Sequence, residues 1–205
     1  MNNYEYIIAS LPVLEKDGQN PGLPSAESLV ADILEQCSEA DRAAVELLLA
    51  GMDGKWGEEG AEEFYRGALQ HPDAFIRDYF AFDLRMRNAK VSMLNHDLGR
   101  SPEQDLIILD EASDAPSELA EARGVFSTAG LMEREKAIDG AYWKMAEEAV
   151  MTDVFSLDIV LSFIARLHIV ERWLALDERT GREMFTKLLG SVRGNFKGFQ
   201  AKQTS

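Results

Sequence analysis

The segment from Asp153 to Val192 restricts the fold more tightly than any other part of the sequence. Its apolar residues recur at intervals of three and four, which is typical of amphipathic helices. We expect two helices here, joined by a turn at residues 177–181. Leu161 and Ile169 fall on the opposite side of the first helix, so we expect that helix to be covered on more than one face. Its main apolar arc consists of Ile159, Val160, Phe163, Ile164, Leu167, Val170 and Leu174.

Helix signals recur along the rest of the chain. Ser25 and Ser38 are suited to cap the N-termini of two helices, and Asp41 follows Ser38 at the spacing of a capping box. Asp73 to Leu98 has the pattern of one long helix, which Gly99 ends. Together these signals predict an all-α bundle of about seven to nine helices, with two long helices at its centre.

Two stretches are harder to assign from their pattern. Tyr4–Leu11 is a short apolar run that fits either a helix or a strand. Ser101-Pro102 is a good helix start and predicts a helix that carries Leu106 to Leu109. Residues 101–122 contain no lysine or arginine but seven acidic residues, so this block is a candidate for an exposed or mobile segment.

The chain length fits one helical domain over residues 1–205. A weak internal echo also aligns Phe75–Arg87 with Val160–Arg172 under a shift of 85 residues. This echo leaves two interpretations open. The chain contains two related helical units, at about residues 1–100 and 101–205, or two amphipathic helices are alike by chance.

The acidity of the chain limits the classes of partner that it can bind. With 36 acidic against 21 basic residues, its net charge is −15. Nucleic acid and anionic membrane surfaces both require a basic footprint, so we expect neither as a direct partner. The acidic surface either serves solubility or suits a basic protein partner. A single cysteine, the lack of a signal-peptide pattern and the lack of a long apolar run favour a cytoplasmic protein that does not insert into the membrane.

No pattern in the sequence points to catalysis. The three histidines lack the Glu-x-x-His setting of di-iron helical bundles. The pattern Gly51-x-x-Gly54-Lys55 has too short a spacing between its glycines for a phosphate loop, and no serine or threonine follows the lysine. We therefore expect a protein that is not an enzyme and uses no cofactor or metal. An enzyme that works through carboxylates or a metal is the less favoured alternative.

Glu171 stands out because it falls inside the apolar arc of its helix. A buried, unpaired carboxylate costs several kcal/mol, so burial would require a cation such as Arg85, Arg87 or Arg172. The alternative is that the arc ends at this position and Glu171 meets water.

Two segments resemble a known family. Residues 82–90, Phe-Asp-Leu-Arg-Met-Arg-Asn-Ala-Lys, lead on to Leu98-Gly99 and are similar to the helix motif of the C-type subunit of V-type and archaeal-type rotary ATPases, which is the d-type subunit in eukaryotes. Residues 153–163, with Glu171-Arg172-Trp173 further on, resemble a later repeat of that protein. Residues 4–12 look like an uncharacterised bacterial family associated with V-type ATPases of Bacteroidetes and related bacteria.

The resemblance implies a helical, non-catalytic protein that sits on the membrane rotor ring and receives the tip of the central stalk. Its partners would be the central stalk and rotor ring subunits, and its location cytoplasmic and peripheral to a membrane complex. A free-standing helical adaptor between proteins is the alternative. The candidates for structural or partner contacts are Asp83, Arg85, Arg87, Asn88, Lys90, Glu171, Arg172 and Trp173.

Overall fold

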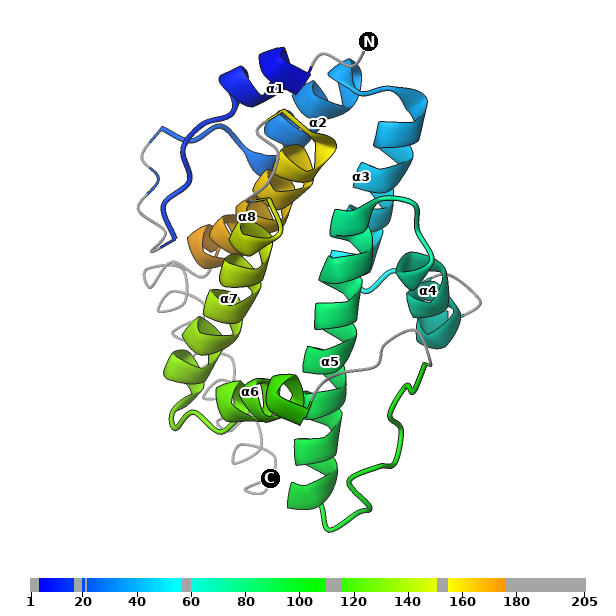
Figure 1. Ribbon diagram of the computed structural model, residues 1–205. Coiled ribbons are helices and arrows are strands. Elements are labelled where there is room, and N and C mark those ends of the chain that lie inside the picture. Colours follow the sequence, from blue (N-terminus) through cyan, green and yellow to red (C-terminus); the bar gives the residue numbers. More distant parts are fainter. Residues whose placement is uncertain are drawn as a thin grey trace, which may run out of the picture.

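The computed structural model describes residues 4–16, 20, 22–56, 60–109, 116–150 and 155–175. Within these ranges the chain forms helices and no strands, so the predicted all-α bundle is confirmed (Figure 1). The turn at 177–181 and the second helix of the C-terminal segment lie outside the described residues. The helices are α1 (Tyr4–Ser10), α2 (Ala26–Gln36), α3 (Glu39–Met52), α4 (Gly60–Leu69), α5 (Ala74–Asp97), α6 (Pro116–Phe126), α7 (Leu131–Glu148) and α8 (Leu157–Ala175).

Helix α8 forms the centre of the hydrophobic core. It packs against α1, α2, α3, α5 and α7, so the prediction that it is covered on more than one face is confirmed. Even its one buried hydroxyl is satisfied, because Ser162 Oγ donates a hydrogen bond of 2.7 Å to the carbonyl of Ala146 on α7. The buried residues of α8 are Val160, Leu161, Ser162, Phe163, Ile164, Ala165, Leu167, Ile169 and Val170.

Helix α5 is the longest described helix, and its ends are those that the sequence predicts. The Asp73 side chain caps its N-terminus by accepting a hydrogen bond from the Ile76 amide at 3.0 Å. Its C-terminus is followed by Gly99 with a φ of 68°, a conformation that glycine adopts without strain. The predicted caps Ser25 and Ser38 are also confirmed, since each side chain accepts an amide hydrogen bond from its own helix.

Two pairs of neighbouring helices form the body of the molecule (Figure 1). Helix α7 packs along α8, and α4 packs on the outer side of α5. Helix α6 crosses between α5 and α7 and contacts both of them. Helices α1, α2 and α3 gather at the other end and contact α8. The three helices α5, α6 and α7 therefore meet at one side of the molecule, away from α1 and α2.

An aromatic cluster joins α3, α4 and α5. The ring of Phe80 is fully buried and meets Phe64 edge to face, with ring centroids 5.0 Å apart. Tyr65 and Tyr79 make further edge-to-face contacts with Phe80. Gly51 on α3 lies directly against this cluster, because a Cβ atom there would overlap the Phe80 ring and lie 2.7 Å from Phe64 Cζ. The absence of a side chain at Gly51 is thus what allows α3 to approach.

The prediction of a helix at residues 101–109 is wrong. Residues 102–105 form turns, and residues 106–109 are not helical. The reason is that a side chain of α5 hydrogen-bonds to the backbone of this segment. Asn88 Nδ2 donates to the Ile107 carbonyl at 2.7 Å, and Asn88 Oδ1 accepts from the Ile107 amide at 3.1 Å. These bonds occupy backbone groups that a helix would pair internally.

Asn95, two helical turns further along α5, holds the same loop by donating to the Gln104 carbonyl at 2.6 Å. The structure also contains a helix that the sequence interpretation missed, since α6 begins within the acidic block at residues 101–122. Residues 110–115 of that block fall outside the described part of the chain. None of the helices in the described ranges has both the length and the apolar character that crossing a membrane requires.

Candidate functional site

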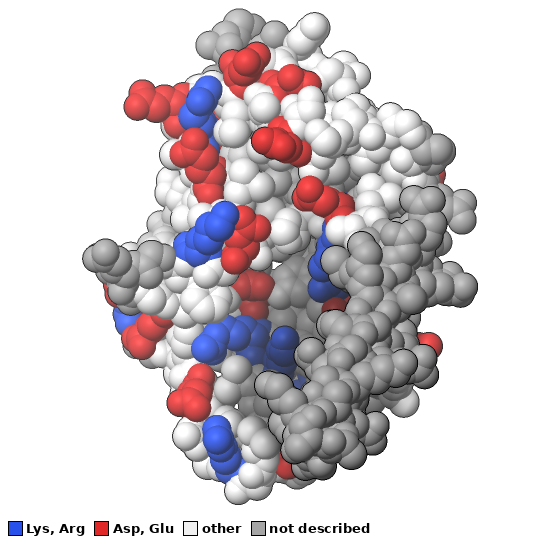
Figure 2. Space-filling model, turned by 180° about the vertical axis from the view of Figure 1, so that it is seen from behind, with Lys and Arg blue, Asp and Glu red and all other residues white. Residues whose placement is uncertain are grey.

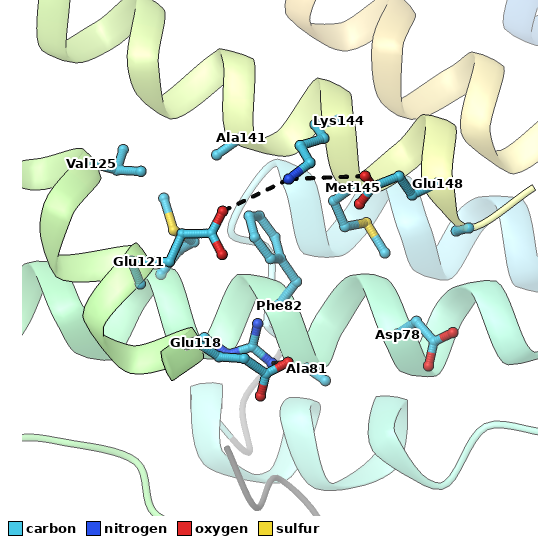
Figure 3. A pocket seen from close by; sticks show the side chains of 14 residues that line it. Asp78, Ala81, Phe82, Glu118, Glu121, Val125, Ala141, Lys144, Met145 and Glu148 are labelled. Carbon is cyan, nitrogen blue, oxygen red and sulfur yellow. Dashed lines mark ion pairs between the residues drawn. The ribbon is translucent and has the colours of Figure 1, made fainter. Parts of the chain in front are cut away.

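A groove with a volume of about 390 Å³ opens where α5, α6 and α7 meet (Figure 3). Its floor is apolar and its rim is charged. Because three separate helices line it, the groove depends on the tertiary fold. The lining residues are Asp78, Ala81, Phe82, Arg85 and Met86 from α5; Glu118, Glu121, Ala122 and Val125 from α6; and Ala141, Lys144, Met145, Glu148 and Ala149 from α7 and its C-terminal end.

Four carboxylates and two cations line the rim of the groove. Glu118 and Glu121 lie toward one end, and Asp78 and Glu148 toward the other (Figure 3). Lys144 stands between them, with its Nζ 3.9 Å from a carboxylate oxygen of both Glu121 and Glu148. These distances exceed those of hydrogen bonds, and exposed pairs of this kind contribute little to stability. The charges of Lys144, Glu121 and Glu148 are therefore accessible to a partner.

Arg85, a residue that the resemblance singles out, forms part of the groove wall. Its guanidinium is 3.5 Å from a Glu118 oxygen and 6.0 Å from the centroid of the Phe82 ring. The ion pair links α5 to α6, and the contact with Phe82 combines charge with apolar packing. Arg85 thus holds the two helices that form one end of the groove.

Asp83 fixes the helices beneath the groove. Tyr142 on α7 donates to Asp83 Oδ1 at 2.6 Å, and Tyr65 on α4 donates to Oδ2 at 2.5 Å. One carboxylate on α5 therefore joins three helices. Tyr142 also meets Phe82 edge to face at 5.0 Å, so this contact continues into the groove wall. We call Asp83, Tyr65 and Tyr142 the buried triad, in which Tyr65 is almost fully buried and the other two residues are partly buried.

The electrostatics of the buried triad follow from its position. Burial raises the pKa of the Asp83 carboxyl, and the hydrogen bonds from Tyr142 and Tyr65 and the charge of Arg87 offset only part of that rise. Burial, together with the charge of Asp83, also raises the pKa of both tyrosines. Both hydroxyls keep their protons and act as donors. This is a structural arrangement, because each carboxylate oxygen accepts a hydrogen bond from a side chain of the protein itself.

Residues 53–195 match the family described as "Protein of unknown function (DUF2764)", which is more than half of the chain. The chain belongs to the DUF2764 family. The matched region begins after α3 and includes α4 to α8, so all three helices of the groove lie within it. No curated protein and no solved structure matches the chain.

Two other candidates on α5 of this DUF2764 protein, Asn88 and Arg87, contact the loop after the helix. Asn88 holds that loop through Ile107, as described above. Arg87 Nη1 lies 3.3 Å from Asn88 Oδ1 and 3.5 Å from the Asp105 carbonyl, so its hydrogen bonds support the same loop weakly. Lys90 is exposed. Apart from Lys90, the α5 candidates therefore divide between the buried triad, the groove wall and the loop contact.

The candidates on α8 of the DUF2764 region form a separate contact with α7. Arg172 and Trp173 both donate to Asp139 Oδ2, at 2.5 and 2.7 Å, and Arg172 also lies 3.2 Å from Glu135. Asp139 is only 6% exposed, so the two donors satisfy a buried carboxylate. The hydrogen bonds and ion pairs described for Arg172 and Trp173 go to α7 and not to an α5 candidate.

Glu171 lies on the exposed side of α8, so of the two alternatives the one in which it meets water is observed. The buried acid paired with Arg172 is Asp139 instead, and the sequence interpretation missed it. Asp139 carried no signal of its own, because acidic residues are frequent throughout α7. Its burial follows from the approach of Trp173, which only the packing of α7 on α8 produces.

The groove of this DUF2764 protein is lined by apolar side chains, four carboxylates and two cations. Its lining includes no histidine, cysteine or serine. Across the residues that the structure describes, no three histidine, cysteine, aspartate or glutamate side chains are grouped so as to hold a metal ion. What the groove does offer is an apolar floor between charged ends, which is a surface for recognition.

Proposed function

We propose that this protein is a non-catalytic structural component of a V-type rotary ATPase, similar in role to the C-type subunit, which links the central stalk to the membrane rotor ring. The observation that carries the proposal is that α5 residues within the segment of the resemblance hold this helix to its neighbours. Asp83, Arg85 and Asn88 each tie α5 to a neighbouring part of the chain. A protein that transmits force between other subunits needs rigid contacts of this sort.

The surface charge supports a role in protein binding. On the face seen in Figure 2, acidic side chains gather over the upper half, while basic ones lie mostly in the middle and below. A net charge of −15 favours association with basic surfaces and disfavours anionic lipids. The protein would therefore reach the membrane through other subunits and remain cytoplasmic and peripheral. The groove between α5, α6 and α7 supplies a defined place for such contacts.

Native co-purification tests this role. We expect a chromosomally tagged form, extracted with mild detergent, to carry central stalk and rotor ring subunits in a constant ratio through size-exclusion chromatography. A reciprocal purification through a tagged stalk protein serves as the control, because it establishes that the ATPase stays intact. An intact ATPase that lacks this protein would contradict the proposal. A stable complex with other proteins in that case would favour the free-standing adaptor.

A further inference from the structure

We propose that the groove between α5, α6 and α7 binds an amphipathic helix of a partner protein, one with two basic residues about two helical turns apart beside an apolar face. This inference rests on the proposed function only in that the chain binds another protein. Beyond that role, the inference specifies the binding surface on this chain and the pattern of charged and apolar residues on the partner helix.

The floor of the groove fits the apolar face of a helix. Phe82 and Met86 from α5, Val125 from α6 and Met145 from α7 line it, together with alanines from all three helices. Phe82 supplies a large apolar surface, while methionine side chains adapt to the shape of what they contact. Small alanines leave space for the partner's longer side chains. Binding of an amphipathic helix in an apolar groove is a common mode of peptide recognition.

The charges at the two ends set the sign and spacing of the partner's polar residues. Asp78 and Glu148 mark one end, and Glu118 beside Arg85 marks the other (Figure 3). Asp78 and Arg85 are seven residues apart on α5, which is about 10 Å along a helix. A partner helix that lies along α5 presents residues i and i+7 at the same spacing. Basic side chains at these positions reach Asp78 at one end and the α6 carboxylate of Glu121 at the other.

Lys144 does not neutralise the acidic rim, so the groove still favours a basic partner over an acidic one. It stands 3.9 Å from both Glu121 and Glu148, and its side chain is 63% exposed. One lysine shared at this distance leaves both carboxylates largely hydrated, so they can form shorter hydrogen bonds with a partner's cations. With four carboxylates and two cations on the rim, an acidic helix would meet net repulsion.

A charge-swap experiment with a synthetic probe tests the inference. The probe is a stapled helical peptide of about 14 residues with leucines on one face and two lysines spaced i and i+7. The groove variant combines Asp78→Lys and Glu121→Lys, one at each end. The matched control combines Glu35→Lys and Glu46→Lys, which make the same charge change at exposed sites on α2 and α3. Fluorescence anisotropy measures binding to the full chain.

We expect the groove variant to bind the lysine probe at least tenfold more weakly than the wild-type protein, and the control variant to bind it within about twofold. A second probe with glutamates in place of the lysines should reverse this order and prefer the groove variant. This gain of binding separates recognition from a loss of folding. Circular dichroism should give the same melting temperature for all three proteins, because every substituted side chain is exposed.

Three results would overturn the inference: no binding of the lysine probe to the wild-type protein, equal loss in the groove and control variants, or failure of the glutamate probe to prefer the groove variant. The assay contains no part of an ATPase. A successful charge swap combined with failed co-purification would therefore reject the rotary ATPase role and leave the groove assignment standing. A failed charge swap combined with successful co-purification would reject the groove assignment and leave the rotary ATPase role standing.

Discussion

Replacing Gly51 with alanine should lower the free energy of unfolding by about 2–3 kcal/mol, because the new methyl group has no room. It would overlap the ring of Phe80 and lie 2.7 Å from Phe64 Cζ. Neither ring can turn aside cheaply. Phe80 is fully buried, and the two rings already pack edge to face with an interplanar angle of 86°. The substitution therefore forces α3 away from the aromatic cluster.

Thermal or urea unfolding monitored by circular dichroism measures the effect of Gly51→Ala, for which we expect a melting temperature about 5–10 °C lower. Gly67→Ala is the matched control. Gly67 lies in α4, and a Cβ atom there would have no neighbour within 4 Å. Since alanine favours helix more than glycine does, this change should raise stability by about 0.5–1 kcal/mol. Equal effects of the two substitutions would show that helix propensity, rather than packing, governs Gly51.

Removing the acceptor of the buried triad should also be costly. In Asp83→Leu the hydroxyls of Tyr65 and Tyr142 both lose their partner, and we expect a loss of about 2–4 kcal/mol of unfolding free energy. Asp83→Asn keeps the shape and the hydrogen bonds, because one tyrosine donates to the amide oxygen and the other accepts from the amide nitrogen. It should stay within about 1 kcal/mol of the wild-type protein. Comparable losses in both variants would contradict this account.

The stability difference between the wild-type protein and Asp83→Asn should depend on pH. Burial raises the pKa of Asp83 above its ordinary value of 3.8, so the folded protein takes up this proton before the unfolded chain does as pH falls. The wild-type protein should therefore gain stability relative to Asp83→Asn as pH falls through the folded-state pKa. The gain is complete below about 3.8 and is lost again as pH rises. Urea unfolding of both proteins at a series of pH values between 7 and about 4 follows the difference, in which other carboxyl groups cancel. A constant difference across this range would contradict the raised pKa.

The parts of the fold that were predictable from sequence depend on local signals. The apolar arc around Val160 and Ile164 established α8, and the serine and aspartate caps set the starts of α2, α3 and α5. Such signals act within a few residues, so no knowledge of the remaining chain is needed.

The parts that were not predictable depend on contacts between distant segments. Ser101-Pro102 is a good helix start, yet Asn88 competes for the backbone of Ile107 from 19 residues away, and its hydrogen bonds prevail. The role of Gly51 depends on the position of Phe80 on another helix, and the burial of Asp139 depends on Trp173. The groove is the clearest case, because its charges come from three helices and no stretch of sequence contains its pattern.

Three of the candidate residues on α5 make contacts that their sequence pattern alone did not reveal. Asp83 and Asn88 are only five residues apart on α5 and serve different neighbours, one the tyrosines of α4 and α7 and the other the loop before α6. Arg85 between them faces the groove. Three residues close together on one helix thus fix three separate contacts.

Site-specific photo-crosslinking within cells tests most directly whether this protein uses the groove to join a rotary ATPase. A photoreactive amino acid replaces Lys144 on the groove rim in one strain and Lys55, which follows α3, in another. Both lysines are well exposed, at 63% and 73% of the side chain. We predict crosslinks from position 144 to a central stalk or rotor ring protein, and none from position 55. ATPase crosslinks from position 55 but not from position 144 would contradict the account.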